Sequence, residues 1–207
     1  MKYVSIDIET TGLNSEKHQV LEFAAILEDT NNLLPFEEIP KFSCIIEHSE
    51  IIGQPIAINM NQRIMKILSD YWMAKGDDRL KLKEKFNIIY QEELASKFIY
   101  WLAPFFSTKN NSYAGLELYS YKFNFNIAGK NYASFDEKFL NKMAGWNELV
   151  KNNRRIIDPS ILYTNFATDD VLPSLDKCLE LASINKCVTH TAIEDAWDVI
   201  QVLRKKY

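Results

Sequence analysis

The chain has 207 residues, of which 47% are hydrophobic and 25% are charged, and its formal net charge is −4. These values are ordinary for a globular protein with one sizeable core, and no run approaches the roughly 20 apolar residues of a membrane span, which excludes a transmembrane helix. The acidic balance argues against a long duplex footprint held through many phosphates, but it is compatible with a short single-stranded end held by metal ions.

The first residues predict a strand and no targeting segment. Apolar and polar side chains alternate over residues 2–8, and the acids in this strand exclude the core of a signal peptide. The three cysteines, Cys44, Cys178 and Cys187, have no C-x-x-C spacing, so neither a disulfide framework nor a zinc site is indicated. We therefore expect a cytoplasmic protein with reduced cysteines.

The rest of the chain alternates between strand and helix patterns. Short apolar runs predict further strands at 19–28, 41–48, 123–128 and 156–158. Apolar residues at helical spacing predict helices at 59–68, 84–106, 174–183 and 191–206. The first three strands are expected to pair antiparallel, and the order of elements predicts one α/β domain with a mixed sheet over residues 1–207.

Two acids on the first strand form the first candidate site. Asp7 and Glu9 are two residues apart, so both carboxylates project from one face, about 6–7 Å apart at the backbone. Two acids side by side on a buried sheet surface are costly unless a cation compensates their charge. An isolated D-x-E pair also fits a solvated strand face, but this pair follows an apolar strand and runs directly into the sequence T-T-G-L.

A second acid-bearing segment follows the strand at 123–128. Ser134 and Glu137 form a capping box, which predicts a helix with Asp136 in its first turn. The helix dipole alone would favour an acid at that position. The segment therefore becomes informative only together with the other two.

A third segment opens the last helix. Thr191 and Glu194 form another capping box, which places His190 just before the helix and Asp195 in its first turn. A histidine beside a helix cap is by itself compatible with an ordinary surface position. The occurrence of all three segments in one chain is not explained by these separate interpretations.

The three segments, in this order, resemble the motifs of the DEDDh (DnaQ-like) exonuclease family. The first is similar to the family's D-x-E-T-T-G motif, and the second resembles its N-x-x-F-D motif through Asn131, Phe135 and Asp136. The third resembles H-x-x-x-x-D through His190 and Asp195. The sister subfamily carries tyrosine four residues before the last Asp, a position that is threonine here, so the histidine branch is indicated.

The resemblance implies a ribonuclease-H-like fold, a mixed β-sheet flanked by α-helices, with insertions around 70–90 and 107–122. It also implies a 3′→5′ exonuclease that releases 5′-mononucleotides from the 3′ end of single-stranded DNA or RNA. The implied cofactor is a pair of Mg²⁺ or Mn²⁺ ions, which suit hard oxygen ligands.

The resemblance also implies a role for each acid. Asp7 would bind both ions, Glu9 and Asp195 would complete one of them, and Asp136 would act through water. His190 would be the general base that takes a proton from the attacking water, because imidazole groups titrate near neutral pH.

The expected substrate contacts are less sharply defined. The residues expected to line the pocket of the 3′-terminal nucleotide are Thr10, Thr11, Gly12 and Leu13. Phe135 fits either the core or a stacking platform, and Asn131 fits either a strand contact or an ordered turn. The tyrosines of the second insertion, which are Tyr113, Tyr119 and Tyr121, either extend the platform or cover the sheet or a subunit contact.

Two alternatives stay open from the sequence alone. The chain could be a proofreading or repair DNA exonuclease that acts with a polymerase partner. It could also be a nucleic-acid-binding module that has kept the fold and lost the chemistry, although the presence of all five motif residues argues against this. A homodimer is expected only at the level of the family, and no membrane partner is expected.

Overall fold

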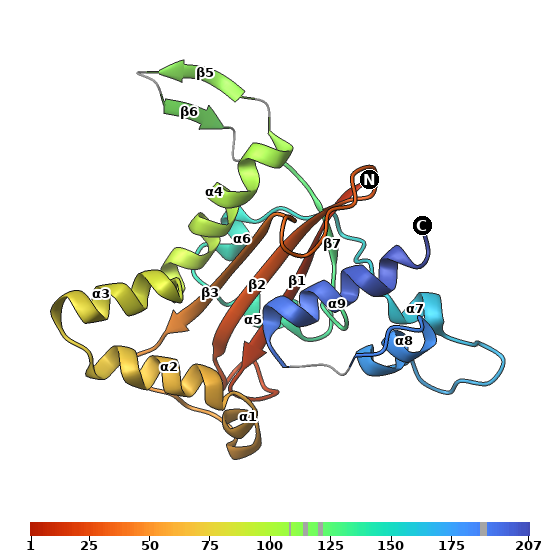
Figure 1. Ribbon diagram of the computed structural model, residues 1–207, viewed down its shortest axis with the longest axis horizontal. Helices are drawn as coiled ribbons and strands as arrows, with labels where there is room; N and C mark the ends of the chain where they lie inside the picture. Colours follow the sequence, from red (N-terminus) through yellow and green to blue (C-terminus); the bar gives the residue numbers. More distant parts are fainter. Residues whose placement is uncertain (108, 114–115, 120–121, 187–189) are drawn as a thin grey trace.

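A computed structural model of the protein describes residues 1–107, 109–113, 116–119, 122–186 and 190–207, and its centre is a five-stranded mixed sheet (Figure 1). The strands, in spatial order, are β4 (Ile88–Tyr90), β3 (Lys41–Glu47), β2 (Val20–Asp29), β1 (Lys2–Thr10) and β7 (Asn126–Ala128). β2 pairs antiparallel with both β1 and β3, whereas the two outer strands pair parallel with their neighbours. The predicted antiparallel pairing of the first three strands is confirmed.

Helices cover both faces of this sheet. They are α1 (Pro55–Met60), α2 (Gln62–Met73), α3 (Gly76–Lys85), the 3₁₀ turn η1 (Gln91–Glu93), α4 (Leu94–Phe106), α5 (Asp136–Leu140), α6 (Trp146–Leu149), α7 (Ser160–Tyr163), α8 (Leu175–Leu181) and α9 (Ala192–Arg204). Figure 1 shows α9 along one face of β1 and β2, with α4 and α6 on the other side of the sheet. Among the described residues, none of these helices combines the length and apolarity that crossing a membrane would require.

The alternation of β1 divides the core between these two faces. Val4, Ile6 and Ile8 are buried against α4, α5 and α6 in an aromatic-rich cluster. The odd-numbered side chains face α9, where Tyr3 joins the apolar side of that helix and the Ser5 hydroxyl donates to the Ala196 carbonyl at 2.8 Å. The odd-numbered face therefore carries Ser5 and both acids of the strand, Asp7 and Glu9.

The predicted helix over 84–106 is wrong over residues 86–93. α3 continues to Lys85, β4 follows, and α4 begins only at Leu94. Ile88 and Ile89 are both buried but belong to clusters on opposite faces of the sheet, which is the geometry of a strand and not of a helix. The region 70–90, expected to be an insertion, thus supplies an outer strand of the central sheet.

The second predicted insertion contains a small hairpin. β5 (Lys109–Tyr113) pairs antiparallel with β6 (Leu116–Tyr119), and Figure 1 shows the pair beyond the end of α4. The side chains of Tyr113 and Tyr119, and the whole of Tyr121 and Cys187, lie outside the described part of the chain. The roles expected for those tyrosines stay predictions.

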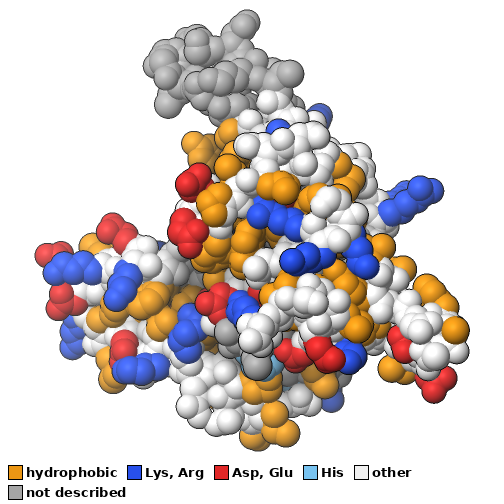
Figure 2. All heavy atoms as spheres, turned by 45° about the vertical axis from the view of Figure 1, so that its right-hand side comes forward, with side chains coloured by type: hydrophobic (Ala, Val, Ile, Leu, Met, Phe, Trp, Pro, Cys, Tyr) orange, Lys and Arg blue, Asp and Glu red, His pale blue; other side chains and the backbone are white. Residues whose placement is uncertain are grey.

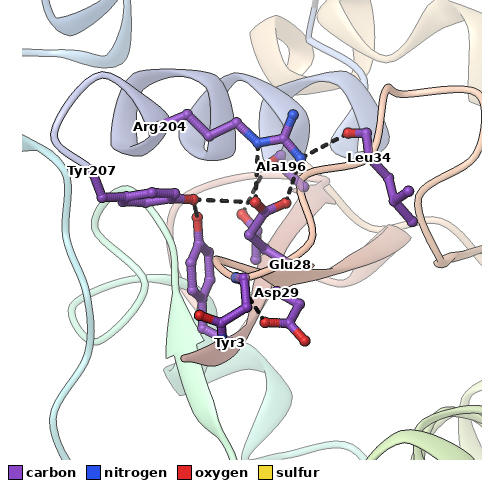
Figure 3. Close-up of polar contacts among 9 residues, drawn as sticks. Tyr3, Glu28, Asp29, Leu34, Ala196, Arg204 and Tyr207 are labelled. Carbon is purple, nitrogen blue, oxygen red and sulfur yellow. Dashed lines mark hydrogen bonds and ion pairs between the residues drawn. The ribbon is translucent and has the colours of Figure 1, made fainter.

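A buried ion pair fixes the C-terminal end of α9 to β2 (Figure 3). Glu28 of β2 is fully buried, and its carboxylate accepts two hydrogen bonds from the Arg204 guanidinium, at 3.0 and 2.7 Å. Arg204 also donates to the Leu34 carbonyl at 2.8 Å, and the Tyr207 hydroxyl donates to Glu28 at 3.2 Å. The same guanidinium lies 4.9 Å from the ring centre of Trp197, about two turns earlier on the helix.

Removal of this cation should be costly, because it leaves a buried carboxylate without its partner. We predict that Arg204→Met lowers the free energy of unfolding by about 3–5 kcal/mol in urea titrations. The matched control is Lys66→Met, whose pair with Asp70 is exposed on α2 and should be worth less than about 1 kcal/mol. Equal losses in the two variants would contradict this assignment.

Candidate active site

Asp7 and Glu9 lie near the C-terminal end of β1, on the face that α9 covers. Both side chains are half-buried. In the antiparallel pair with β2, Asp7 stands opposite Ala24 and Glu9 stands opposite Glu22. Because directly opposite residues project from the same face, β2 adds a further acid beside the two predicted ones.

α9 brings Asp195 to the same place. Asp195 is 7% exposed and lies in the first turn of the helix, whose apolar side packs on β1 and β2. Carboxylate oxygens of Asp7, Glu9 and Asp195 all lie within 4.8 Å of one another. β1 and α9, which lie near opposite ends of the sequence, thus contribute acids to one cluster of three.

Asp136 and His190 complete the surroundings of this cluster. Asp136 is the first residue of α5 and is 3% exposed. His190 is exposed, precedes α9, and has a backbone φ of 54°. All five predicted residues line one cleft of about 400 Å³, together with Ile8, Lys130, Asn131, Ser134 and Phe135.

The acids strongly perturb one another. Burial and then the charges of neighbouring acids raise the pKa of the Asp7 carboxyl well above its usual range. In decreasing order of effect, those neighbours are Asp136, Asp195, Glu9 and Glu22. The Asp7 carboxyl therefore resists ionisation unless a cation is close.

Two further carboxyl groups behave in the same way. Burial, followed by the charges of Asp195 and Glu22, raises the pKa of Glu9 to about 7, although the Asn61 amide and the Arg63 guanidinium oppose the shift. Burial raises the pKa of Asp136 to about 8, against the effect of backbone N–H groups. A cleft of converging carboxylates that resist ionising together suits a hard divalent cation, whose charge would compensate theirs.

Neither predicted capping box forms. The Ser134 hydroxyl donates to the Asn131 carbonyl at 3.0 Å, and α5 begins only at Asp136. Thr191 does occupy the N-cap position of α9, but its side chain makes no capping hydrogen bond. A carboxylate from another element takes this place, because Glu22 accepts the Ala192 N–H at 3.2 Å.

Asn131 does not match the N-x-x-F-D motif as predicted. It lies four residues before Phe135, whereas the motif requires three, and the matching position is the buried Tyr132. Asn131 has a φ of 61°, donates its N–H to Asp158 at 3.0 Å and accepts from Lys130 at 2.8 Å. In the structure, Asn131 therefore orders a turn at the rim of the cleft.

The turn after β1 is held by its own side chains. The Thr10 hydroxyl donates to the Gly12 carbonyl at 2.9 Å, and the fully buried Thr11 hydroxyl donates to the Ile52 carbonyl at 2.6 Å. A Cβ at Gly12 would lie 2.5 Å from the His18 ring, so only glycine fits there. Leu13 is 76% exposed. None of these four residues lines the acidic cleft, so their contact with a nucleotide stays a prediction.

Phe135 lies between the core and the cleft. Its side chain is half-buried and lines the cleft, and its ring centre is 5.1 Å from that of the core residue Phe139. Phe135 thus contacts the core and also lines the cleft, and its role as a stacking platform stays a prediction.

Sequence reasoning missed three residues beside the site, namely Glu22, Asn61 and Arg63. Arg63 forms an ion pair with Glu22 at 2.6 Å, and the Asn61 amide donates to the Thr10 carbonyl at 3.2 Å. The available signal was a glutamate within the otherwise apolar run Val20–Leu27, because an acid buried in a strand needs a partner.

Comparison with known proteins bears on the fold and on the first of the three segments. Residues 4–64 match the RNase_T family model, described as an exonuclease. E. coli exonuclease I, in a zinc-bound complex with single-stranded DNA, aligns with a TM-score of 0.58 and 16% identity over 99% of this chain and 39% of that chain. Exonuclease I from Methylocaldum szegediense aligns with a TM-score of 0.57 and 13% identity over 99% and 40%. No curated protein sequence matches.

These likenesses confirm the α/β, ribonuclease-H-like fold. The family match covers β1 and therefore the segment with Asp7 and Glu9, which is the segment that resembles the first exonuclease motif. The chain spans about 40% of the length of the exonuclease I chains that it matches.

The raised pKa values predict how stability depends on pH when no divalent metal is present. Unfolded Asp and Glu titrate near pH 4, but Glu9 and Asp136 titrate at about 7 and 8 in the folded protein. Between these values the folded state binds more protons, so stability should fall as pH rises. We expect the melting temperature in EDTA to drop by roughly 5 °C or more from pH 5 to pH 8.5.

The Asp7→Asn variant isolates the contribution of the cleft. It should flatten this decline, because it removes one of the repelling charges. Asp70→Asn, at an exposed position on α2, should follow the wild-type curve. If wild type and Asp7→Asn decline in parallel, the pH dependence arises outside the cleft.

Proposed function

We propose that the protein is a metal-dependent 3′→5′ exonuclease that releases 5′-mononucleotides from the 3′ end of single-stranded nucleic acid. The observation that carries the proposal is the convergence of Asp7, Glu9 and Asp195 within 4.8 Å, with Asp136 and His190 in the same cleft. A binding module without chemistry would have no use for so many mutually repelling acids. Residues 1–207 act in this proposal as one exonuclease domain.

The substrate class is supported by the related structures. One solved structure of E. coli exonuclease I is a complex with single-stranded DNA. Another contains a dT13 oligonucleotide, and this chain aligns with that enzyme with a TM-score of 0.53. The protein's surface shows acidic and basic side chains interspersed across the face drawn in Figure 2, which fits a short strand end better than a long duplex. Lys130, which is half-buried at the cleft, supplies a positive charge for a phosphate group.

The cofactor in this proposal is a pair of Mg²⁺ or Mn²⁺ ions. Asp7, Glu9 and Asp195 would hold them directly, and Asp136 would act through water. When bound, such ions promote ionisation of the attacking water and stabilise the charge on the attacking and leaving oxygens. Mg²⁺ and Mn²⁺ are favoured because the cluster offers only carboxylate oxygens and no thiolate.

The protein's own groups orient the strand and move the proton. His190 accepts the proton of the water that attacks the last phosphodiester, and its exposed position before α9 leaves it free to reach the cleft. The bond from phosphorus to the 3′ oxygen of the penultimate nucleotide breaks, and the terminal 5′-mononucleotide leaves. The exposed Leu13 and the half-buried Phe135 contact the terminal base.

The direct test is digestion of 5′-labelled single-stranded DNA, single-stranded RNA and duplex DNA with Mg²⁺ or Mn²⁺. Wild type should shorten the single strands stepwise from the 3′ end and release 5′-mononucleotides. Asp7→Asn should abolish turnover while leaving the metal-free melting temperature unchanged or raised, and Asp70→Asn should retain turnover. Near-normal hydrolysis by Asp7→Asn, or internal cleavage by wild type, would refute the proposal.

His190→Ala tests the proton transfer. Turnover should fall on the order of 10²- to 10⁴-fold, the usual contribution of a positioned acid–base group. Mn²⁺ affinity should stay close to that of wild type, because the histidine is not proposed as a ligand. A general base works only in its unprotonated form, so the rate of wild type should be lower at acid pH, and the variant should lose this dependence.

The control for this prediction is His48→Ala, since His48 contacts the Val20 carbonyl at 2.7 Å and lines a different cavity. It should keep the wild-type profile of rate against pH. A loss of metal binding in His190→Ala that matches its loss of rate would remove the histidine from proton transfer.

A further inference from the structure

Glu22 is a fifth acid beside the four acids of the cleft. It is only 7% exposed, and it stands directly opposite Glu9 in the pairing of β1 with β2. An acid so placed must either join the metal ligands or be neutralised by other groups. The contacts of its carboxylate decide between these two possibilities.

One carboxylate oxygen of Glu22 connects three elements. Its Oε2 accepts from Arg63 Nη2 of α2 at 2.6 Å and from the Ala192 N–H of α9 at 3.2 Å. Glu22 is not a member of the three-acid cluster of Asp7, Glu9 and Asp195. Its carboxylate instead contacts a guanidinium and the first N–H group of a helix.

The contact with α9 replaces the missing side-chain cap. The first N–H groups of a helix have no partner within the helix, and Thr191 provides no capping hydrogen bond. The Glu22 carboxylate takes this role, and its charge is favourable at the positive end of the helix dipole. Ala192 is three residues before Asp195, so this contact fixes the helical turn that presents Asp195 to β1.

The contact with Arg63 fixes α2 in the same assembly. Arg63 lies two residues after Asn61, whose amide donates to the Thr10 carbonyl at the end of β1. α2 is therefore attached to β1 through Asn61 and to β2 through Arg63. The Arg63 side chain is 45% exposed, so it can be replaced without opening the core.

We infer that Glu22 and Arg63 are a positioning pair, which holds Asp195 and Glu9 in the arrangement that binds divalent metal without itself contacting metal or substrate. The inference rests on the proposed function, because the metal site belongs to it. Residues that orient metal ligands from behind commonly change metal affinity by about 10- to 100-fold when they are replaced.

The direction in which Arg63→Met changes Mn²⁺ affinity distinguishes positioning from simple electrostatics. Arg63→Met removes a positive charge near the acids, so electrostatics alone would tighten the binding of a cation. If the pair positions the ligands, the same variant should weaken Mn²⁺ binding about 10-fold or more. Glu22→Gln with Arg63→Met restores the net charge, so electrostatics alone predicts wild-type affinity, whereas positioning predicts that binding stays weak.

The experiment measures Mn²⁺ dissociation constants by calorimetry on the full chain after EDTA treatment, and the metal-free melting temperature of each variant. Arg63→Lys should recover part of the affinity that Arg63→Met loses. Tyr207→Phe and Arg204→Met disturb the other end of α9 and are the matched controls. They should lower the melting temperature and leave the Mn²⁺ dissociation constant unchanged.

The outcomes are separable from those of the proposed function. Tighter Mn²⁺ binding by Arg63→Met, or equal weakening by the controls at the far end of α9, would overturn the inference while leaving an active nuclease in place. Wild type that binds Mn²⁺ but cleaves neither DNA nor RNA would refute the proposed function, and the dissociation constants would still decide the role of the pair. Failure of wild type to bind Mn²⁺ would overturn both.

Discussion

The docking of α9 on β2 is the constraint on which the arrangement of the site depends. Two buried glutamates of β2, Glu22 and Glu28, lie on the same face six residues apart, a separation of roughly 20 Å along a strand. α9 has 13 residues, which is also roughly 20 Å of helix. One glutamate accepts the first N–H of α9 and the other binds Arg204 in its last turn. α9 is thus held at both ends, and the contact at its first turn is the one that lies beside Asp195.

The two faces of the sheet contribute differently to the stability of the metal-free protein, because one carries repelling acids and the other carries apolar side chains. The face toward α9 carries the repelling acids of the cleft, whose pKa values burial and mutual charge raise. The opposite face is filled by apolar side chains, including a stacked pair of Phe98 and Trp146 with ring centres 5.5 Å apart. Burial of such large aromatic surfaces contributes much of the stability of a domain. The fold can therefore tolerate a site that destabilises the metal-free protein.

The sequence predicted the structure best where a pattern of residues fits only one kind of element or site. The alternation of β1 predicted which face of the sheet carries Asp7. The order of the three acid motifs predicted that Asp7, Asp136 and Asp195 lie together, and in the structure they line one cleft. Sequence reasoning failed where tertiary contacts override local patterns. Ile88 and Ile89 fell within the predicted helix over 84–106 but form β4, and each is buried on a different face of the sheet.

The capping boxes failed for a related reason. A threonine at the N-cap of α9 predicts a local hydrogen bond, but a glutamate 170 positions earlier reaches the helix terminus instead. No pattern within a short window contains that partner. Asn131 shows the opposite error, in which a motif was matched one residue out of register and the backbone geometry reveals a turn.

The contact between Arg204 and Trp197 has a practical consequence for spectroscopy. Trp197 is half-buried on α9, with the guanidinium on one side and the Phe36 ring, 5.5 Å away between ring centres, on another. Indole emission responds to a nearby cation and to water, so movement of α9 away from the sheet changes the surroundings of this fluorophore first. The chain therefore contains an intrinsic fluorophore two residues from Asp195, and its signal can be isolated by replacing the other three tryptophans with phenylalanine.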